Sequence, residues 1–102
     1  MFARVARYEV PEDRLEDATA AFGEAGAEVA QLDGFAGGYV LVDQEDGRML
    51  TLTLWDNLST LESSEHQAGN ARRHAAETAG GSVLSVEKFE VTHELAAHPS
   101  TA

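Results

Sequence analysis

The residues best suited to chemistry lie close together, between positions 50 and 74 of the chain. This stretch, LTLTLWDNLSTLESSEHQAGNARRH, holds the one tryptophan, Trp55, and two of the four histidines, His66 and His74. The indole of Trp55 offers a flat apolar wall for an aromatic ligand, together with one N–H donor. An imidazole can take up a proton near neutral pH or bind a metal ion. We therefore treat these three side chains as candidates for a catalytic or ligand-binding site.

Each of the three also has a purely structural interpretation. Trp55 stands at the end of an apolar segment, where an aromatic side chain can serve the core alone. His66 and Asn70 are four residues apart and share one helix face. That face points to solvent unless the helix breaks near Gly69 and brings His66 over the mouth of a cavity. On a helical wheel, His74 lies beside the apolar stripe, as a partly exposed surface histidine would. Both interpretations stay open at the level of sequence.

Arg7 is the candidate cation of the site. It alternates with Tyr8 along a predicted strand, so the two side chains point to opposite faces. An inward Arg7 would hold a phenolate or a carboxylate in place. The alternative is an ion pair with an acid of the last strand, Glu87 or Glu90. The predicted catalytic set is Trp55, His66 and Arg7, and the predicted substrate-binding set is Phe22, Tyr39, Trp55, Asn70 and His74.

The composition argues against several classes of function. The chain has 18 acidic and 7 basic residues, and its net charge of -11 repels nucleic acid and anionic membrane. It has no cysteine, which excludes disulfides, thiolate metal sites and cysteine nucleophiles. No zinc-type histidine motif and no phosphate-binding glycine loop occurs, so we expect neither a metal nor a cofactor. No segment resembles the apolar core of a signal peptide or a membrane span, so we expect a cytoplasmic protein.

The elements that must position these residues follow one order along the chain. A length of 102 residues allows a single domain, which we place at residues 1–94, with a flexible tail at 95–102. Asp46-Gly47 is a hairpin signal between two strands, and Gly80 ends the second helix. The alternation and spacing of apolar residues predict strands at residues 2–10, 35–43, 48–56 and 83–93 and helices at residues 12–30 and 57–79. This order is that of an α+β, ferredoxin-like βαββαβ fold with a four-stranded antiparallel sheet.

The second predicted helix carries two start signals. Asn57 or Ser59 can cap its beginning, and Ser64 with Gln67 three residues later forms a second possible capping box. Two signals this close predict a helix that is broken into a short first turn and a main segment.

The third strand is apolar on both of its faces. Leu50, Leu52 and Leu54 point one way, whereas Met49, Thr51, Thr53 and Trp55 point the other way. Two helices can cover only one face of a four-stranded sheet, so the other face needs a separate cover. The simplest cover is the same sheet of a second subunit, which predicts a homodimer.

The chain resembles the antibiotic biosynthesis monooxygenase-like domains of the dimeric α+β barrel superfamily. The segments that carry the resemblance are ARVARYEVPEDR, LDGFAGGYVLVDQEDG, LTLWDNLSTLESSE and VLSVEKFEV, which together extend over about residues 1–94. The resemblance implies a dimer whose ligand sits in a cavity between the helices and one face of the sheet. Members of this superfamily include cofactor-independent monooxygenases of phenolic or quinol-type polyketides and haem-degrading enzymes.

Three functions follow as expectations. The first is cofactor-independent monooxygenation of a small aromatic substrate such as a phenol, a quinol or a polyketide-like molecule, in which Trp55 contacts the ring and Arg7 or His66 handles its charge. The second is a non-enzymatic dimeric barrel that binds a small hydrophobic ligand. The third is haem binding, with His74 as the iron ligand. The haem-degrading relatives also use a tryptophan where this chain has Ser64 and an asparagine where it has Ala6 or Arg7, so two of three positions depart from their pattern.

Overall fold

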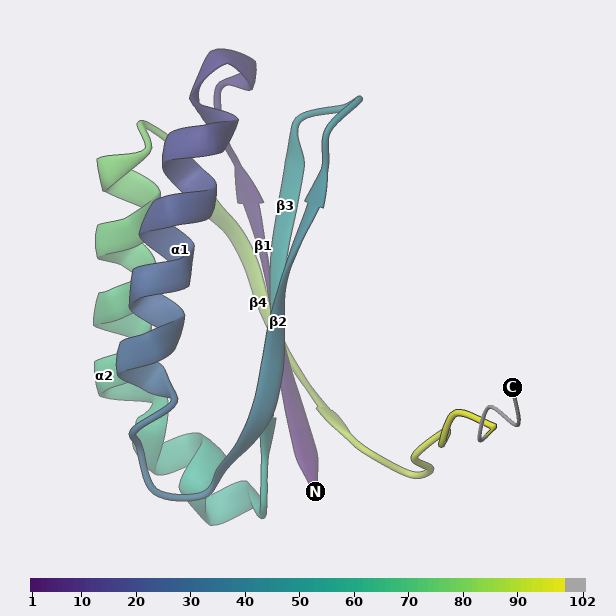
Figure 1. Cartoon of the computed structure of the whole chain (residues 1–102). Helices are drawn as coiled ribbons and strands as arrows, with labels where there is room; N and C mark the ends of the chain where they lie inside the picture. Colours follow the sequence, from purple (N-terminus) through teal and green to yellow (C-terminus); the bar gives the residue numbers. More distant parts are fainter. Residues whose placement is uncertain (99–102) are drawn as a thin grey trace.

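A computed structural model describes residues 1–98 and shows four strands and two long helices within them, in the predicted order (Figure 1). The strands are β1 (Phe2–Glu9), β2 (Phe35–Asp43), β3 (Arg48–Trp55) and β4 (Ser82–Glu90). The helices are α1 (Leu15–Val29), which follows the short turn η1 (Glu12–Arg14), and α2 (Leu58–Thr78). Residues 91–98 form neither helix nor strand, and part of the predicted tail at 95–102 lies outside the described residues.

The four strands form one antiparallel sheet in the order β2-β3-β1-β4. Both helices pack on the same face of this sheet, as Figure 1 shows. In the register of β1 and β3, Phe2 lies opposite Trp55 and Arg4 lies opposite Thr53. Residues directly opposite each other point to the same face. The even-numbered residues of β1 and the odd-numbered residues of β3 therefore face the helices, as Trp55, Phe22 and their neighbours in the core confirm.

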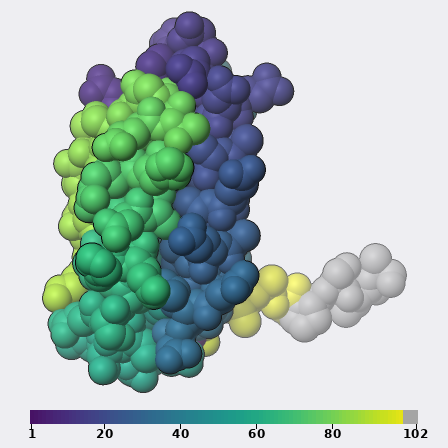
Figure 2. Space-filling model, turned by 90° about the vertical axis from the view of Figure 1, so that its left-hand side faces the viewer, coloured from purple at the N-terminus to yellow at the C-terminus, as the bar shows by residue number. Residues whose placement is uncertain are grey.

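The helix α1 packs on the sheet through one apolar stripe, as its spacing predicts. Leu15, Ala18, Phe22 and Val29 are its buried residues. Most of the buried residues of α2 are alanines, whose small side chains let the two helices lie close to each other and to the sheet. Figure 2 looks onto this face and shows the atoms of α1 and α2 side by side over the sheet. Within the described residues, neither helix is both long and apolar enough to cross a membrane.

The predicted break in the second helix is wrong, because α2 is continuous over its 21 residues. Asn57 is its N-cap and accepts a hydrogen bond from the Thr60 backbone N–H at 2.9 Å. Ser64 donates instead to the Leu61 carbonyl at 2.7 Å, a serine-to-backbone bond of the kind that bends helices. Figure 1 shows the first turns of α2 lying across one end of the sheet before the helix turns along it. The second start signal thus marks a bend, and the helix does not break near Gly69.

Within residues 1–98, no element covers the sheet face opposite the helices (Figure 1). Large apolar side chains on this face and along its edges are 46 to 65% exposed. These residues are Tyr39, Leu41, Leu84 and Phe89. Several large apolar side chains exposed on one side of a sheet are typical of an interaction face.

Candidate functional site

A cavity of about 310 Å³ lies between α1 and the helix-facing side of the sheet. This volume is at the lower end of the range of ligand pockets, about 300–1,000 Å³. The α1 side of the cavity is apolar and carries Phe22, Ala25, Gly26 and Val29. The sheet and α2 supply its polar groups, which are Arg4, Tyr8, Thr51, Thr53 and Arg72. The cavity therefore suits a small, largely apolar ligand with few polar atoms.

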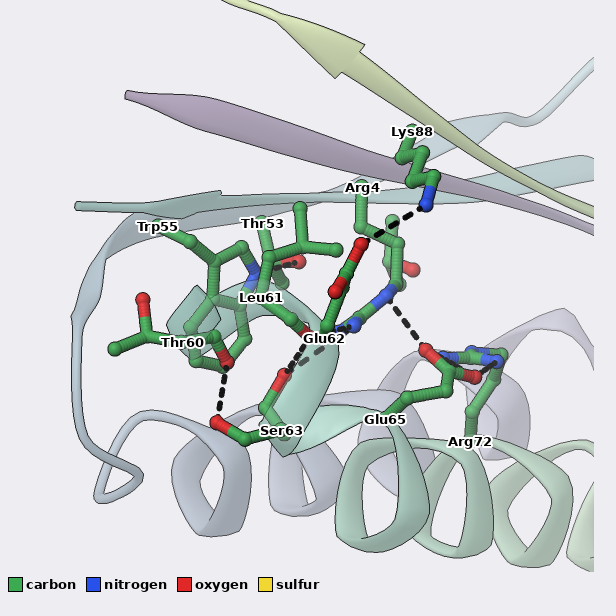
Figure 3. A network of polar contacts seen from close by, with 12 residues as sticks. Arg4, Thr53, Trp55, Thr60, Leu61, Glu62, Ser63, Glu65, Arg72 and Lys88 are labelled. Carbon is green, nitrogen blue, oxygen red and sulfur yellow. Dashed lines mark hydrogen bonds and ion pairs between the residues drawn. The ribbon is translucent and has the colours of Figure 1, made fainter. Parts of the chain in front are cut away.

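Arg4 is the most deeply buried charged residue of the site, with 4% of its surface exposed. Its Nη2 donates to the Leu61 carbonyl at 2.6 Å and to the Ser64 hydroxyl at 3.2 Å. Its Nε lies 2.9 Å from a carboxylate oxygen of Glu65 (Figure 3). Burial lowers the pKa of the Arg4 guanidinium, and the negative charge of Glu65 opposes that change. Arg4 thereby ties β1 to the bend of α2.

Glu65 is shared between two guanidinium groups. It binds Arg4 through one carboxylate oxygen and accepts hydrogen bonds from Arg72 at 3.1 to 3.4 Å. The Arg72 side chain is only 10% exposed, whereas that of Glu65 is 48% exposed. Two cations and one anion leave this side of the cavity with one positive charge in excess.

Trp55 is completely buried and is not itself a lining residue of the cavity. Its indole N–H donates to the Thr53 hydroxyl at 3.0 Å, and Phe35 meets its ring edge-on with centroids 5.5 Å apart. The guanidinium carbon of Arg4 lies 5.4 Å from its ring centroid, within the range of a cation–π contact. Trp55 thus orients Arg4 and Thr53, and both of these residues line the cavity.

Tyr8 presents a neutral phenol to the cavity. Its hydroxyl lies 2.9 Å from the Thr51 hydroxyl, and its ring packs against Phe22 with centroids 4.3 Å apart. Burial raises the pKa of Tyr8 above its ordinary value, while the hydrogen bond with Thr51 and the nearby Arg72 and Arg4 charges lower it to a smaller extent. Tyr8 can therefore donate or accept a hydrogen bond at neutral pH but does not serve as a base.

The raised pKa of Tyr8 gives a testable pH dependence. In a Tyr39→Phe background, Tyr8 is the one tyrosine left and should ionise above the ordinary value of about 10. Tyr8 then has a lower pKa in the unfolded chain than in the folded protein. Its ionisation should therefore leave the free energy of unfolding unchanged below about pH 10 and lower it as the pH rises above that value. Adding Thr51→Val should raise the Tyr8 pKa further. Ultraviolet absorbance of the tyrosinate measures both values, and a Tyr8 pKa below 10 would contradict the assignment.

The structure brings two of the predicted site residues to the cavity. Phe22 and Tyr39 both border it, but Tyr39 lies opposite Leu52, on the sheet face away from the helices, and is 65% exposed. Trp55 is completely buried and does not line it. Arg7 lies on the opposite face of the sheet and pairs with Glu87 at 3.5 Å, the alternative that the sequence left open.

The other three predicted residues lie on exposed positions of α2. Asn70 and His74 border an outer groove between the two helices, together with Glu24 and Glu28 of α1. His66 is exposed and borders neither the cavity nor this groove.

The polar lining of the cavity was missed at the sequence level. No motif in the sequence marks Arg4, Thr51, Thr53 or Arg72, and Tyr8 stands out only as the neighbour of Arg7. The alternation of β3 already placed the two threonines on the same face as Trp55. In β1 the pattern was ambiguous, because Val5 and Tyr8 point to opposite faces and either one can mark the core side.

Comparisons with known proteins agree with this fold. The model of the family described as antibiotic biosynthesis monooxygenase matches residues 1–78. A crystal structure of a putative antibiotic biosynthesis monooxygenase from Deinococcus radiodurans superposes with a TM-score of 0.78 at 16% identity, covering 97% of this chain and 100% of the other. A comparison with curated protein sequences found no match.

Two further solved structures have the same fold, one described by its activity and the other by its bound ligand. SnoaB from Streptomyces nogalater, a cofactor-independent oxygenase crystallised as a mutant, gives a TM-score of 0.70 at 20% identity, over 92% of this chain and 95% of that one. A mutant of MhuD was crystallised with two manganese protoporphyrin IX molecules per active site. It gives a TM-score of 0.73 at 20% identity, over 95% of this chain and 100% of that one. At these identities the likeness establishes the fold alone.

Proposed function

Because this chain belongs to the antibiotic biosynthesis monooxygenase family, we propose that it is a cofactor-independent monooxygenase of a small phenolic or quinol-type aromatic molecule. The observation that carries this proposal is the cavity of about 310 Å³, with an apolar wall on α1 and hydrogen-bonding groups on the sheet. SnoaB, which has this fold, is described as a cofactor-independent oxygenase.

In the proposed reaction, the substrate itself is the reductant. A phenol loses its O–H proton, and the electron-rich anion passes one electron to O₂. The resulting radicals combine to form a peroxide on the ring, which loses water to give a quinone. One oxygen atom of O₂ enters the product and the other leaves as water, so a phenol and O₂ give a quinone and H₂O. The protein must bind the ring, exclude water and stabilise the anion.

The lining of the cavity explains how the phenol would be ionised without a protein base. Its described residues include no carboxylate and no imidazole. The guanidinium groups of Arg4 and Arg72 instead favour the anionic form of a bound phenol, which lowers its pKa. Tyr8 and Thr51 add hydroxyl donors to the same side.

The same observation supports a second candidate function. A cavity without a base or a nucleophile also suits a non-enzymatic protein that binds a small hydrophobic or aromatic ligand. The two functions differ in whether oxygen is consumed when the ligand is present.

Haem binding does not fit the described residues. His74, the predicted iron ligand, is exposed beside Glu24 and Glu28 in the outer groove, and the cavity lining contains no histidine. A neutral imidazole inside the pocket is the ordinary anchor for haem iron.

Oxygen uptake tests the proposed monooxygenase. With a panel of naphthols, naphthoquinols and anthrones, at least one member should consume oxygen at a rate proportional to enzyme concentration, without added metal or cofactor. In ¹⁸O₂, mass spectrometry should find one labelled atom in the quinone product. Binding of panel members without any oxygen uptake would favour the second candidate and contradict the first.

We further propose a homodimer formed through the uncovered sheet faces, in the cytoplasm. The exposed apolar residues of that face, Leu41, Leu84 and Phe89 among them, support this arrangement. Light scattering after size-exclusion chromatography should give twice the mass of the 10.9 kDa chain. Leu84→Lys, whose side chain is 61% exposed, should shift the protein toward the monomer. A parent protein that runs as a monomer at micromolar concentration would contradict the dimer.

A further inference from the structure

The guanidinium of Arg4 has one donor group without a partner. Its Nη1 is buried and has no hydrogen-bond acceptor, and it is the one such side-chain atom found among residues 1–98. The Arg4 side chain is 5% exposed, so water does not freely satisfy this group. A buried N–H group of a cation that lacks an acceptor is costly, and native structures rarely contain one.

The other two guanidinium nitrogens of Arg4 already have partners. Nε and Nη2 share one edge of the planar guanidinium, and this edge faces Glu65, Ser64 and the Leu61 carbonyl of α2. The N–H groups of Nη1 are consequently directed away from these acceptors. Arg4 lines the cavity and also a second hollow, which Glu62 and Glu87 border. Neither of these acids accepts a hydrogen bond from Nη1, and a ligand in the cavity would supply the missing acceptor.

The charge of the surroundings specifies the kind of acceptor. Glu65 is the one acid that pairs with Arg4 and Arg72 among the described residues, and both guanidinium groups border the cavity. Arg4, Arg72 and Glu65 together carry one net positive charge, although the formal net charge of the whole chain is -11. This local positive charge in an acidic protein favours a ligand with one negative charge.

We propose that the cavity selects a flat aromatic monoanion whose negatively charged oxygen accepts a hydrogen bond from Arg4 Nη1. The inference rests on the proposed function for the place of the ligand and adds the charge class of the substrate. Trp55 and Glu65 act as positioning residues. The Trp55 ring packs near the Arg4 guanidinium, and Glu65 pairs with its Nε. A charge-assisted hydrogen bond to such a donor is stronger than a neutral one.

Two probes of almost the same shape test this selectivity. 1-Hydroxy-2-naphthoate carries a carboxylate, and 1-hydroxy-2-naphthamide replaces it with a neutral amide. Titration calorimetry without oxygen measures their affinities in the absence of turnover. The parent protein should bind the naphthoate at least about tenfold more tightly than the naphthamide.

Two double variants each remove one ion pair, the first at the edge of the cavity and the second on the exposed surface. Arg4→Met with Glu65→Gln removes the Nη1 donor but leaves the positive charge of Arg72, so the ratio of the two affinities should fall at least about threefold. Lys88→Met with Glu62→Gln is the matched control, because Lys88 lies opposite Arg4 on β4 and its pair with Glu62 is exposed. This control should keep the parental ratio. Arg4→Lys keeps the charge without the planar donor and, in a folded protein, should lower the ratio at least about threefold.

Three results would overturn the proposal. They are equal affinity of the parent for both probes, binding of neither probe, and a parental ratio in the Arg4 variants. The outcome is separable from that of the oxygen assay. Selectivity without oxygen uptake refutes only the monooxygenase, and uptake with neutral naphthols by an unselective protein refutes only the charge preference.

Discussion

Replacing Trp55 with alanine should lower the free energy of unfolding by about 3–5 kcal/mol, the range for large aromatic residues in a core. The side chain is 0% exposed, and alanine would leave a void beneath Phe35. It would also remove the aromatic face beside the Arg4 guanidinium and the indole donor to Thr53. Since small domains are stable by only about 5–15 kcal/mol, this one substitution removes a large share of the total.

Trp55→Phe is the matched control for this prediction. It keeps an aromatic face beside Arg4 and loses the indole N–H and part of the volume. We expect a loss of about 1–2 kcal/mol. Urea denaturation followed by circular dichroism measures both variants, at one protomer concentration because a dimer makes stability concentration-dependent. A loss below about 1 kcal/mol for Trp55→Ala would contradict the role of Trp55 as the centre of this packing.

The fold could be predicted from the sequence because its signals are local and mutually consistent. The alternation in residues 48–55 and the Asp46-Gly47 hairpin signal predict β3 and its turn, and the apolar spacing that includes Phe22 predicts α1. The bend of α2 could not be predicted in the same way. It depends on the Leu61 carbonyl, which accepts hydrogen bonds from Ser64 and from Arg4, 57 residues away in the sequence.

The candidate site was harder to predict than the fold, because it depends on which alternate side chains of each strand face the helices. If the odd-numbered residues of β1 faced the helices, Arg7 would point inward, and if the even-numbered ones do, Arg4 points inward. Only the pairing of β1 with β3 decides between the two. The histidines drew attention by their chemistry, although His66 and His74 lie on exposed positions of α2. Arg72 is held in position by its hydrogen bond to Glu65. The two residues are seven positions apart, a spacing that belongs to no known motif.

Filling the cavity should abolish most of the activity. Gly26 lines the cavity from α1, and a Cβ atom added there would meet no other atom within 4 Å. Gly23 lies one turn earlier on the same helix, also has open space at the Cβ position, and is exposed outside the cavity. A phenylalanine at either position alters helix propensity similarly, so the pair isolates the effect of occupying the cavity.

Oxygen uptake by Gly26→Phe and Gly23→Phe, with the panel member that the parent oxidises fastest, tests the central claim most directly. The claim is that oxidation takes place in the cavity between α1 and the sheet. We predict that Gly26→Phe lowers kcat/KM at least about tenfold while Gly23→Phe stays within about twofold of the parent. Equal kcat/KM values for the two variants, with both proteins folded, would contradict the claim and place the reaction elsewhere on the molecule.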